Sequence, residues 1–178
     1  MSEPKVCIGT VGCKLNQFDS EAILSDFRRI GYGTTDVPAE ADLCVVNTCA
    51  VTLAAERKSR NLLRRLGREA PRARLIAAGC LAERDPRTLK AIKGVDTVLG
   101  NREKEHILDF LFRKDGQAVA VGEISSVTGW TDHRVTDGLL GRARAYVKIQ
   151  DGCNEKCTYC IVPELRGRPR SCSVADVT

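Results

Sequence analysis

Six of the nine cysteines in this chain stand in patterns that suit metal-ligand chemistry. Three of them form a compact C-x3-C-x2-C run, made of Cys153, Cys157 and Cys160. Three others each follow closely on a short hydrophobic run, and these are Cys13, Cys49 and Cys80. Three thiolates can hold three irons of a 4Fe–4S cluster and leave the fourth iron open, whereas electron-transfer clusters usually take four cysteines. Two sets of three therefore predict two open clusters, which is typical of chemistry rather than electron storage.

Zinc is the rival metal for the compact run, because C-x2-C pairs are common zinc ligands. A structural zinc site normally needs a fourth protein ligand. The two histidines of the chain, His106 and His133, do not stand at finger-like spacing from these cysteines. The sequence therefore favours iron over zinc.

The first 113 residues alternate hydrophobic strand patterns with helical patterns. Strands are expected at residues 6–11, 43–46, 75–78 and 97–99. Helices are expected at 16–30, 54–68, shortly after Pro86, and at 103–112. Asn16 is expected to cap the first helix, with Asp19 favourably placed in its first turn. Apolar strands alternating with helices indicate an α/β fold, with a doubly wound parallel sheet over residues 1–113.

The three scattered cysteines share a position relative to these strands. In a parallel α/β sheet, ligands bind outside the carboxyl ends of the strands. Each cysteine follows a strand, so we expect all three at one edge of the sheet. Gly12 and Gly79 precede two of them and would let the backbone approach a bulky inorganic core closely.

A small buried hydrophobe is the alternative role for any one of these three, since free cysteine is often a core residue. Their shared position after strands argues against that role for the set. Cys7 and Cys44 lie inside expected strands, where the core interpretation prevails. Cys172 has no evident partner and stays unassigned.

Residues 114–142 interrupt the alternation and are expected to form a linker, with a short strand at 119–121. A new strand is expected at 145–150, and it leads into Asp151, Gly152 and Cys153. The chain thus divides into an α/β domain at 1–113, a linker at 114–142 and the start of a second unit at 143–178.

Composition narrows the class of protein. The chain has 178 residues, 43% hydrophobic content and a net charge of +5, which permits a polyanionic partner. No stretch approaches the roughly 18 apolar residues of a membrane span, and no signal peptide is evident. We therefore expect a cytoplasmic protein without a membrane partner, in which clustered cysteines bind metal rather than form disulfides.

The compact run, with an aromatic residue before its last cysteine, resembles the radical S-adenosylmethionine superfamily at Cys153, Cys157, Tyr159 and Cys160. The resemblance implies a cluster whose open iron binds S-adenosylmethionine and generates a 5′-deoxyadenosyl radical. Tyr159 is then expected beside the bound cofactor, with a core-filling role as its alternative.

Both constellations occur together in the methylthiotransferase family. The chain is similar to that family at Gly12 to Gln17, Asn47 to Thr52, Gly79-Cys80 and Asp151 to Pro163. The resemblance implies an auxiliary 4Fe–4S cluster on Cys13, Cys49 and Cys80, beside the radical-generating cluster. It also implies that a whole radical-enzyme barrel and a small RNA-binding domain follow. We therefore expect this chain to be an amino-terminal fragment, inactive by itself, that holds only the start of the (β/α) barrel.

Within the family, the chain looks most like the branch that modifies N6-threonylcarbamoyladenosine next to the tRNA anticodon. The implied reaction adds a methylthio group to C2 of that adenine. The implied partners are tRNA and an electron donor, which is an unidentified reductase or a flavodoxin. The protein is expected to be a monomer. Isopentenyladenosine tRNA and a ribosomal protein are the alternative substrates. A non-catalytic iron–sulfur or RNA-docking module is the alternative of a different class.

A basic helix supports an RNA partner independently. Basic side chains recur at helical spacing after the second strand, at Arg57, Lys58, Arg60, Arg64 and Arg68. Leu62, Leu63 and Leu66 fall on the opposite face and are expected to pack on the sheet. Clustered arginines can contact phosphates and give salt-sensitive affinity. A solvated helix face is the alternative interpretation.

Overall fold

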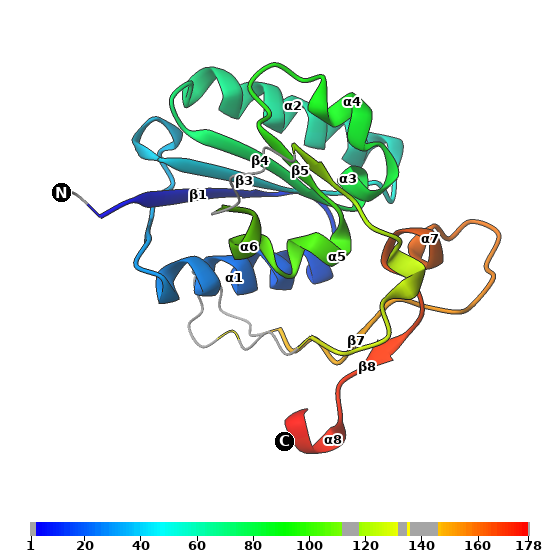
Figure 1. Cartoon of the computed structure of the whole chain (residues 1–178). Coiled ribbons are helices and arrows are strands. Elements are labelled where there is room, and N and C mark those ends of the chain that lie inside the picture. The colour runs from blue at the N-terminus through cyan, green and yellow to red at the C-terminus, as the bar shows by residue number, and fades with distance from the viewer. Residues whose placement is uncertain (1–2, 112–117, 132–134, 136–145, 178) are drawn as a thin grey trace.

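The computed structural model describes residues 3–111, 118–131, 135 and 146–177. Its main sheet has six parallel strands in the order β2-β1-β3-β4-β5-β6 (Figure 1). The strands are β1 (Lys5–Thr10), β2 (Gly33–Thr34), β3 (Leu43–Thr48), β4 (Arg74–Gly79), β5 (Thr97–Leu99) and β6 (Val119–Ala120). The expected α/β fold with a parallel sheet is confirmed.

Helices cover both faces of this sheet, because its central strands are apolar on both sides. One face carries α1 (Lys14–Arg29), α5 (Asn101–Lys104) and α6 (Ile107–Leu111) (Figure 1). The other face carries α2 (Leu53–Glu69), α3 (Cys80–Arg84) and α4 (Pro86–Lys90) (Figure 1). Leu63 and Leu66 of α2 are buried in the core between this helix and the sheet. Leu62 is half-buried and packs against the same core, as expected. Cys7 and Cys44 are also core residues, paired in register between β1 and β3.

The expected capping role of Asn16 is wrong. Helix α1 begins at Lys14, and Cys13 occupies the N-cap position. Asn16 lies inside the first turn, fully buried, and its Nδ2 donates to the carbonyls of Val11 at 2.8 Å and Thr48 at 2.9 Å. The amide joins the loops after β1 and β3, which satisfies buried carbonyls that the helix itself cannot reach.

Two other local expectations differ from the structure. The helix expected at 103–112 is divided into α5 and α6. Residues 146–149, expected as strand, have no regular structure, and only β7 (Gln150–Asp151) pairs, antiparallel with β8 (Arg170–Ser171). The expected linker contributes β6, which extends the sheet beside β5.

Short helices complete the chain, namely η1 (Pro38–Glu40), η2 (Ile124–Ser126), α7 (Val162–Arg166) and α8 (Val174–Val177). Much of the expected linker, at 114–117, 132–134 and 136–142, lies outside the described residues. Among the helices of the described ranges, none combines the length and apolar character needed to cross a membrane.

A buried charge network holds the carboxyl-terminal segment, residues 146–177, against the α/β domain. Asp19 on α1 accepts from Lys104 Nζ at 2.7 Å and from Arg166 at 3.1 Å, and Lys148 Nζ lies 3.3 Å away. Asp151 receives Lys148 Nζ at 2.8 Å and Arg166 at 3.1 Å. All five side chains are at most 6% exposed, so these contacts lie out of water.

Both aspartates of this network are held ionised. Burial by itself would raise the pKa of Asp19, but the positive charges of Lys104, Arg166 and Lys148 outweigh it and lower that pKa. The pKa of Asp151 is likewise lowered, because Arg166 and Lys148 outweigh its burial. An aspartate in an unfolded chain has a pKa of about 3.9. The network therefore stabilises the fold fully above about pH 4 and less as the pH falls below that value.

We predict that Asp19→Asn lowers the free energy of unfolding by about 3–5 kcal/mol near neutral pH, because it leaves buried cations without their carboxylate. The variant should also lose less stability than the parent as the pH falls below about 4. Thermal unfolding followed by circular dichroism across this range measures both effects. Asp26→Asn is the matched control, because it breaks only the pair with the exposed Arg29 and should cost less than about 1 kcal/mol. Equal losses in the two variants would contradict the role given to the network.

Candidate metal centre

The three scattered cysteines lie at the carboxyl edge of the sheet, after β1, β3 and β4. Cys13 is exposed at the N-cap of α1, whereas Cys49 and Cys80 are buried, 2% and 3% exposed. Cys80 is the first residue of α3. Parallel pairing of β1 with β3 and of β3 with β4 brings the three strand ends together.

Gly12 brings the first cysteine loop into contact with the second. Its φ is +113°, a backbone angle that residues other than glycine rarely adopt. A Cβ added to Gly12 would lie 2.6 Å from Cys49 Sγ, so the space that a side chain would take is filled by the thiol. Gly79, with a φ of +97°, plays the same part before Cys80, because an added Cβ would lie 2.5 Å from Asn47 Oδ1.

Polar side chains fix the two buried cysteine loops. Ser59 Oγ on α2 accepts a hydrogen bond from the backbone N–H of Cys49 at 3.0 Å. Thr48 Oγ1 accepts from the backbone N–H groups of Leu81 and Ala82, at 3.1 and 3.3 Å. The backbone around Cys49 and Cys80 is therefore pinned, while Cys13 stands on a more open loop.

A cavity of about 370 Å³ joins the two cysteine sets. Cys13 and Cys80 line it from the α/β domain, and Cys153 lines it from the carboxyl-terminal segment together with Arg166. Apolar side chains, including Leu15, Val51 and Ile161, complete the wall. Cysteines from both triads and one buried cation thus line the same cavity.

The thiol of Cys49 has a raised pKa. Burial raises its pKa, opposed by a hydrogen bond from the backbone of Val51. Negative charge on Cys80 or Cys13 raises the pKa further, since these thiols are close enough to repel one another when ionised. Thiolates gathered in this way suit a shared cationic group.

The three sulfurs do not form a preassembled site for a single ion. Across the described ranges, no three His, Cys, Asp or Glu side chains stand in an arrangement that could hold a metal ion. A zinc ion needs sulfurs about 2.3 Å from one centre, whereas an iron–sulfur cluster is larger and takes sulfurs that lie further apart. Free thiols around one cavity, with glycine in the adjoining loops, fit the larger group.

The second triad lies on a loop that projects from the molecule between β7 and α7 (Figure 1). Cys157 is exposed, and Cys153 and Cys160 are half-buried. Tyr159 is 90% exposed, so the core-filling alternative for this residue is wrong. Its role beside a cofactor stays a prediction.

Asn101 and Arg166 lie beside these cysteines, and the sequence had singled out Arg166 only as part of the run Arg166 to Ser171 that resembles the methylthiotransferase family. Asn101 Nδ2 lies 3.7 Å from Cys80 Sγ and donates to the carbonyl of Leu165 at 2.7 Å. Arg166 lines the cavity, and its guanidinium donates a hydrogen bond to Asn16 Oδ1 at 2.7 Å. Asn101 follows β5, the next strand after the three that carry cysteines, so the strand-end rule extended by one strand would have found it.

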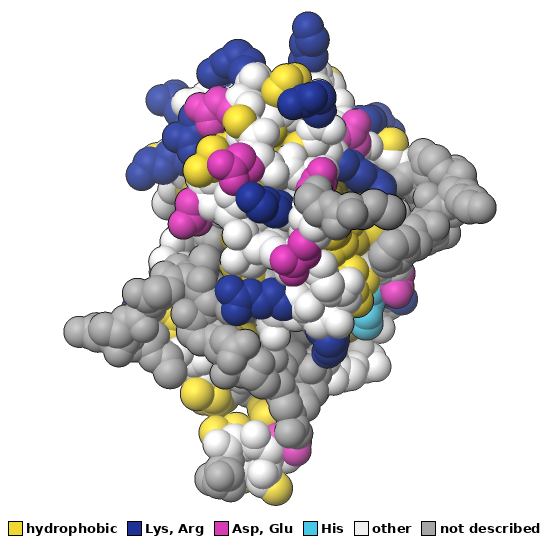
Figure 2. Space-filling model, turned by 90° about the vertical axis from the view of Figure 1, so that its left-hand side faces the viewer, with side chains coloured by type: hydrophobic (Ala, Val, Ile, Leu, Met, Phe, Trp, Pro, Cys, Tyr) yellow, Lys and Arg dark blue, Asp and Glu magenta, His cyan; other side chains and the backbone are white. Residues whose placement is uncertain are grey.

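The basic face of α2 is largely solvent-exposed. Arg57, Lys58, Arg64 and Arg68 are exposed, whereas Arg60 is half-buried and pairs with Glu56 at 2.8 Å. Figure 2 shows Lys and Arg side chains gathered at the top of the molecule, the side on which α2 and α4 lie in Figure 1. Arg60 is therefore engaged internally, and the other four remain available to a partner.

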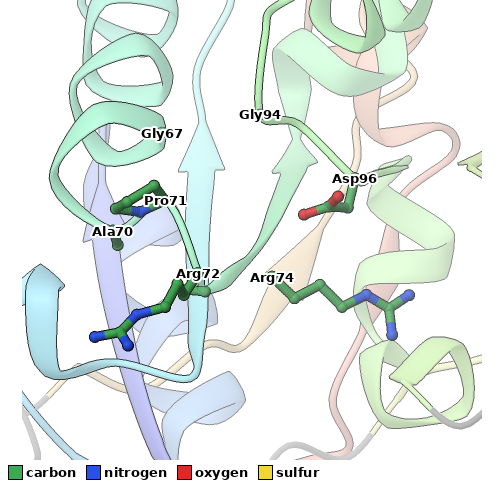
Figure 3. Close-up of a pocket in the computed structure, with 8 residues that line it drawn as sticks. Gly67, Ala70, Pro71, Arg72, Arg74, Gly94 and Asp96 are labelled. Carbon is green, nitrogen blue, oxygen red and sulfur yellow. The ribbon is translucent and has the colours of Figure 1, made fainter.

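A second cavity, of about 390 Å³, lies near the start of β4, at the opposite edge of the sheet (Figure 3). Arg72 and Arg74 line it but point in opposite directions. Arg74 donates to the carbonyls of Phe110 and Leu111, and Asp96 accepts from the backbone of Leu75. These side chains hold loops together and do not converge on a ligand.

Comparison with known proteins places the chain in a family. The model of the uncharacterized protein family UPF0004 matches residues 5–100, more than half of the chain. Threonylcarbamoyladenosine tRNA methylthiotransferase MtaB of Bacillus subtilis is 36% identical over 93% of this chain and 37% of its own length. The tRNA-2-methylthio-N(6)-dimethylallyladenosine synthase of Rhodopirellula baltica is 32% identical over 97% of the chain and 40% of its own length.

The ribosomal protein uS12 methylthiotransferase RimO of Chloroflexus aurantiacus is 33% identical over 97% of the chain and 42% of its own length. The chain thus spans between 37% and 42% of the length of these three relatives. Its α/β domain carries the family match, and the alignments cover nearly all of the chain. The chain therefore belongs to the UPF0004 family, and over nearly all of its length it is similar to methylthiotransferases.

Proposed function

We propose that this chain is part of a radical S-adenosylmethionine methylthiotransferase that modifies C2 of N6-threonylcarbamoyladenosine in tRNA. The observation that carries the proposal is the single cavity lined by Cys13 and Cys80 from one triad and by Cys153 from the other. A transfer reaction needs its sulfur source and its radical source to face one substrate. The likeness to threonylcarbamoyladenosine methylthiotransferases supports the choice of base.

Each triad would hold one 4Fe–4S cluster. Cys13, Cys49 and Cys80 would hold the auxiliary cluster, and the other would be held by Cys153, Cys157 and Cys160. When bound, the clusters with S-adenosylmethionine supply a transferable sulfur and the radical that activates the adenine carbon. Ser59 and Thr48 fix the backbone around Cys49 and Cys80, and the apolar side chains of Leu15, Val51 and Ile161 line the shared cavity.

The placement of α2 supports a tRNA partner. This helix begins at Leu53, four residues after Cys49, with Thr52 Oγ1 accepting from the backbone of Ala55 at 3.1 Å. Its exposed cations therefore start beside the candidate cluster, where Arg57 and Lys58 are the nearest along the helix. A phosphate backbone held there would bring a neighbouring base toward the cavity. The working protein is proposed as a cytoplasmic monomer served by a reductase or flavodoxin.

Nucleoside analysis tests the substrate directly. In a strain lacking the full-length gene, mass spectrometry of digested tRNA should show loss of the 2-methylthio form and accumulation of N6-threonylcarbamoyladenosine. Restoration of the full-length gene should reverse the change, and a copy with Cys49→Ala should not. Loss of 2-methylthio-isopentenyladenosine instead, or of the modification on the ribosomal protein, would contradict the proposed substrate.

We also predict that Arg57, Arg64 and Arg68 contact tRNA phosphates. Changing all three to Ala should weaken binding and reduce the slope of log K against log salt by about 0.9 for each phosphate that is no longer neutralised. Filter binding or fluorescence anisotropy over a range of salt concentrations measures the slope. Arg28→Ala with Arg29→Ala, two exposed arginines at the end of α1, is the matched control and should leave the slope unchanged. An unchanged slope in the triple variant would return this face of α2 to ordinary solvated surface.

A further inference from the structure

Asn101 makes three polar contacts that fix its side-chain amide beside a cysteine of the candidate centre. The residue begins α5 and is 5% exposed. Its Nδ2 donates to the carbonyl of Leu165 at 2.7 Å and lies 3.7 Å from Cys80 Sγ, while its Oδ1 accepts from Lys104 Nζ at 3.0 Å. A primary amide has two N–H hydrogens, so both Nδ2 contacts can be made together.

The orientation of this amide is determined by its partners. A backbone carbonyl can only accept and an ammonium can only donate, so the nitrogen must face Leu165 and the oxygen must face Lys104. Lys104 is itself bound to Asp19 at 2.7 Å. Because hydrogen bonds in a buried chain polarise one another, the ammonium makes the amide N–H groups stronger donors toward the sulfur.

The contact to Leu165 links this donor to the carboxyl-terminal segment. Leu165 belongs to α7, which follows the loop of the second triad, and it lines the shared cavity. The amide is therefore held against Cys80 from two sides, by Lys104 of the α/β domain and by the docked segment. Docking of that segment places a hydrogen-bond donor on a cysteine of the other triad.

We propose that Asn101 is a positioning residue that donates a hydrogen bond to the Cys80 sulfur and thereby raises the reduction potential of the cluster on that sulfur. The inference rests on the proposed auxiliary cluster. Reduction adds one electron to a cluster, and part of the added negative charge resides on its sulfurs. Hydrogen bonds to those sulfurs favour the reduced form, as partners of metal ligands commonly do.

A redox titration of the reconstituted chain tests this role. Cys157→Ala serves as the parent, so that the cluster on the first triad is measured alone, with dithionite as the one-electron donor and electron paramagnetic resonance as the readout. Asn101→Leu removes the donor while keeping a similar side-chain volume. We expect its midpoint potential to fall by about 59 mV, which corresponds to a tenfold change in the equilibrium constant of a one-electron reduction. Asn61→Leu on the exposed face of α2 is the matched control and should leave the potential unchanged.

The outcomes separate this inference from the cluster assignment. An Asn101→Leu protein with full iron and sulfide content and the potential of the parent would overturn the role of Asn101 but leave the cluster in place. A parent that takes up no iron and sulfide would overturn the cluster assignment and the inference with it. Asn101→Ala also removes the N–H donor and adds no charge, so it serves if the leucine variant does not fold. The alanine variant should also show a lower potential, and the parent's potential in a loaded protein would again reject the proposal.

Discussion

The buried carboxylate of Asp19 is the charge on which the arrangement of the candidate centre depends. It lies in α1 and binds Lys104 of α5 together with Lys148 and Arg166 of the carboxyl-terminal segment. These contacts join three parts of the chain that are far apart in sequence. Burial makes every one of these charges costly unless it is paired, so loss of the Asp19 carboxylate would leave its buried cations without that partner. Because Arg166 also lines the cysteine cavity, the same contacts that dock the carboxyl-terminal segment shape the wall of the centre.

The charges of this region complement thiolates. Within the described part of the chain, four cations, Lys104, Lys148, Arg166 and Arg170, stand with three carboxylates, Asp19, Glu105 and Asp151. The positive excess borders a cavity whose cysteines become negative when they bind a metal. Arg166 illustrates the effect, since its pKa is raised above its ordinary value: burial opposes the rise, but the negative charges of Asp19, Cys80 and Asp151 outweigh it.

The sequence predicted the elements well where local signals and topology were sufficient. Apolar runs marked the central strands, and the rule that parallel strands end at one edge placed Cys13, Cys49 and Cys80 together. The charge network was missed because its partners are remote: Lys104 lies 85 residues from Asp19, and Arg166 lies 150 residues from Asn16. Asn16 and Asp19 also look like ordinary helix-start residues, and only tertiary packing turns them into buried ones. The short strand β7 lacked its predicted length because its neighbour β8 pairs with only two of its residues.

Both triads are proposed to hold clusters that open on one cavity. Anaerobic reconstitution with iron and sulfide, followed by metal analysis and electron paramagnetic resonance of the reduced chain, tests this proposal most directly. We predict two clusters whose signals broaden each other magnetically, with Cys49→Ala removing one cluster and Cys157→Ala the other, and the broadening absent in either variant. Stoichiometric zinc without sulfide, or two clusters with no magnetic interaction, would contradict it.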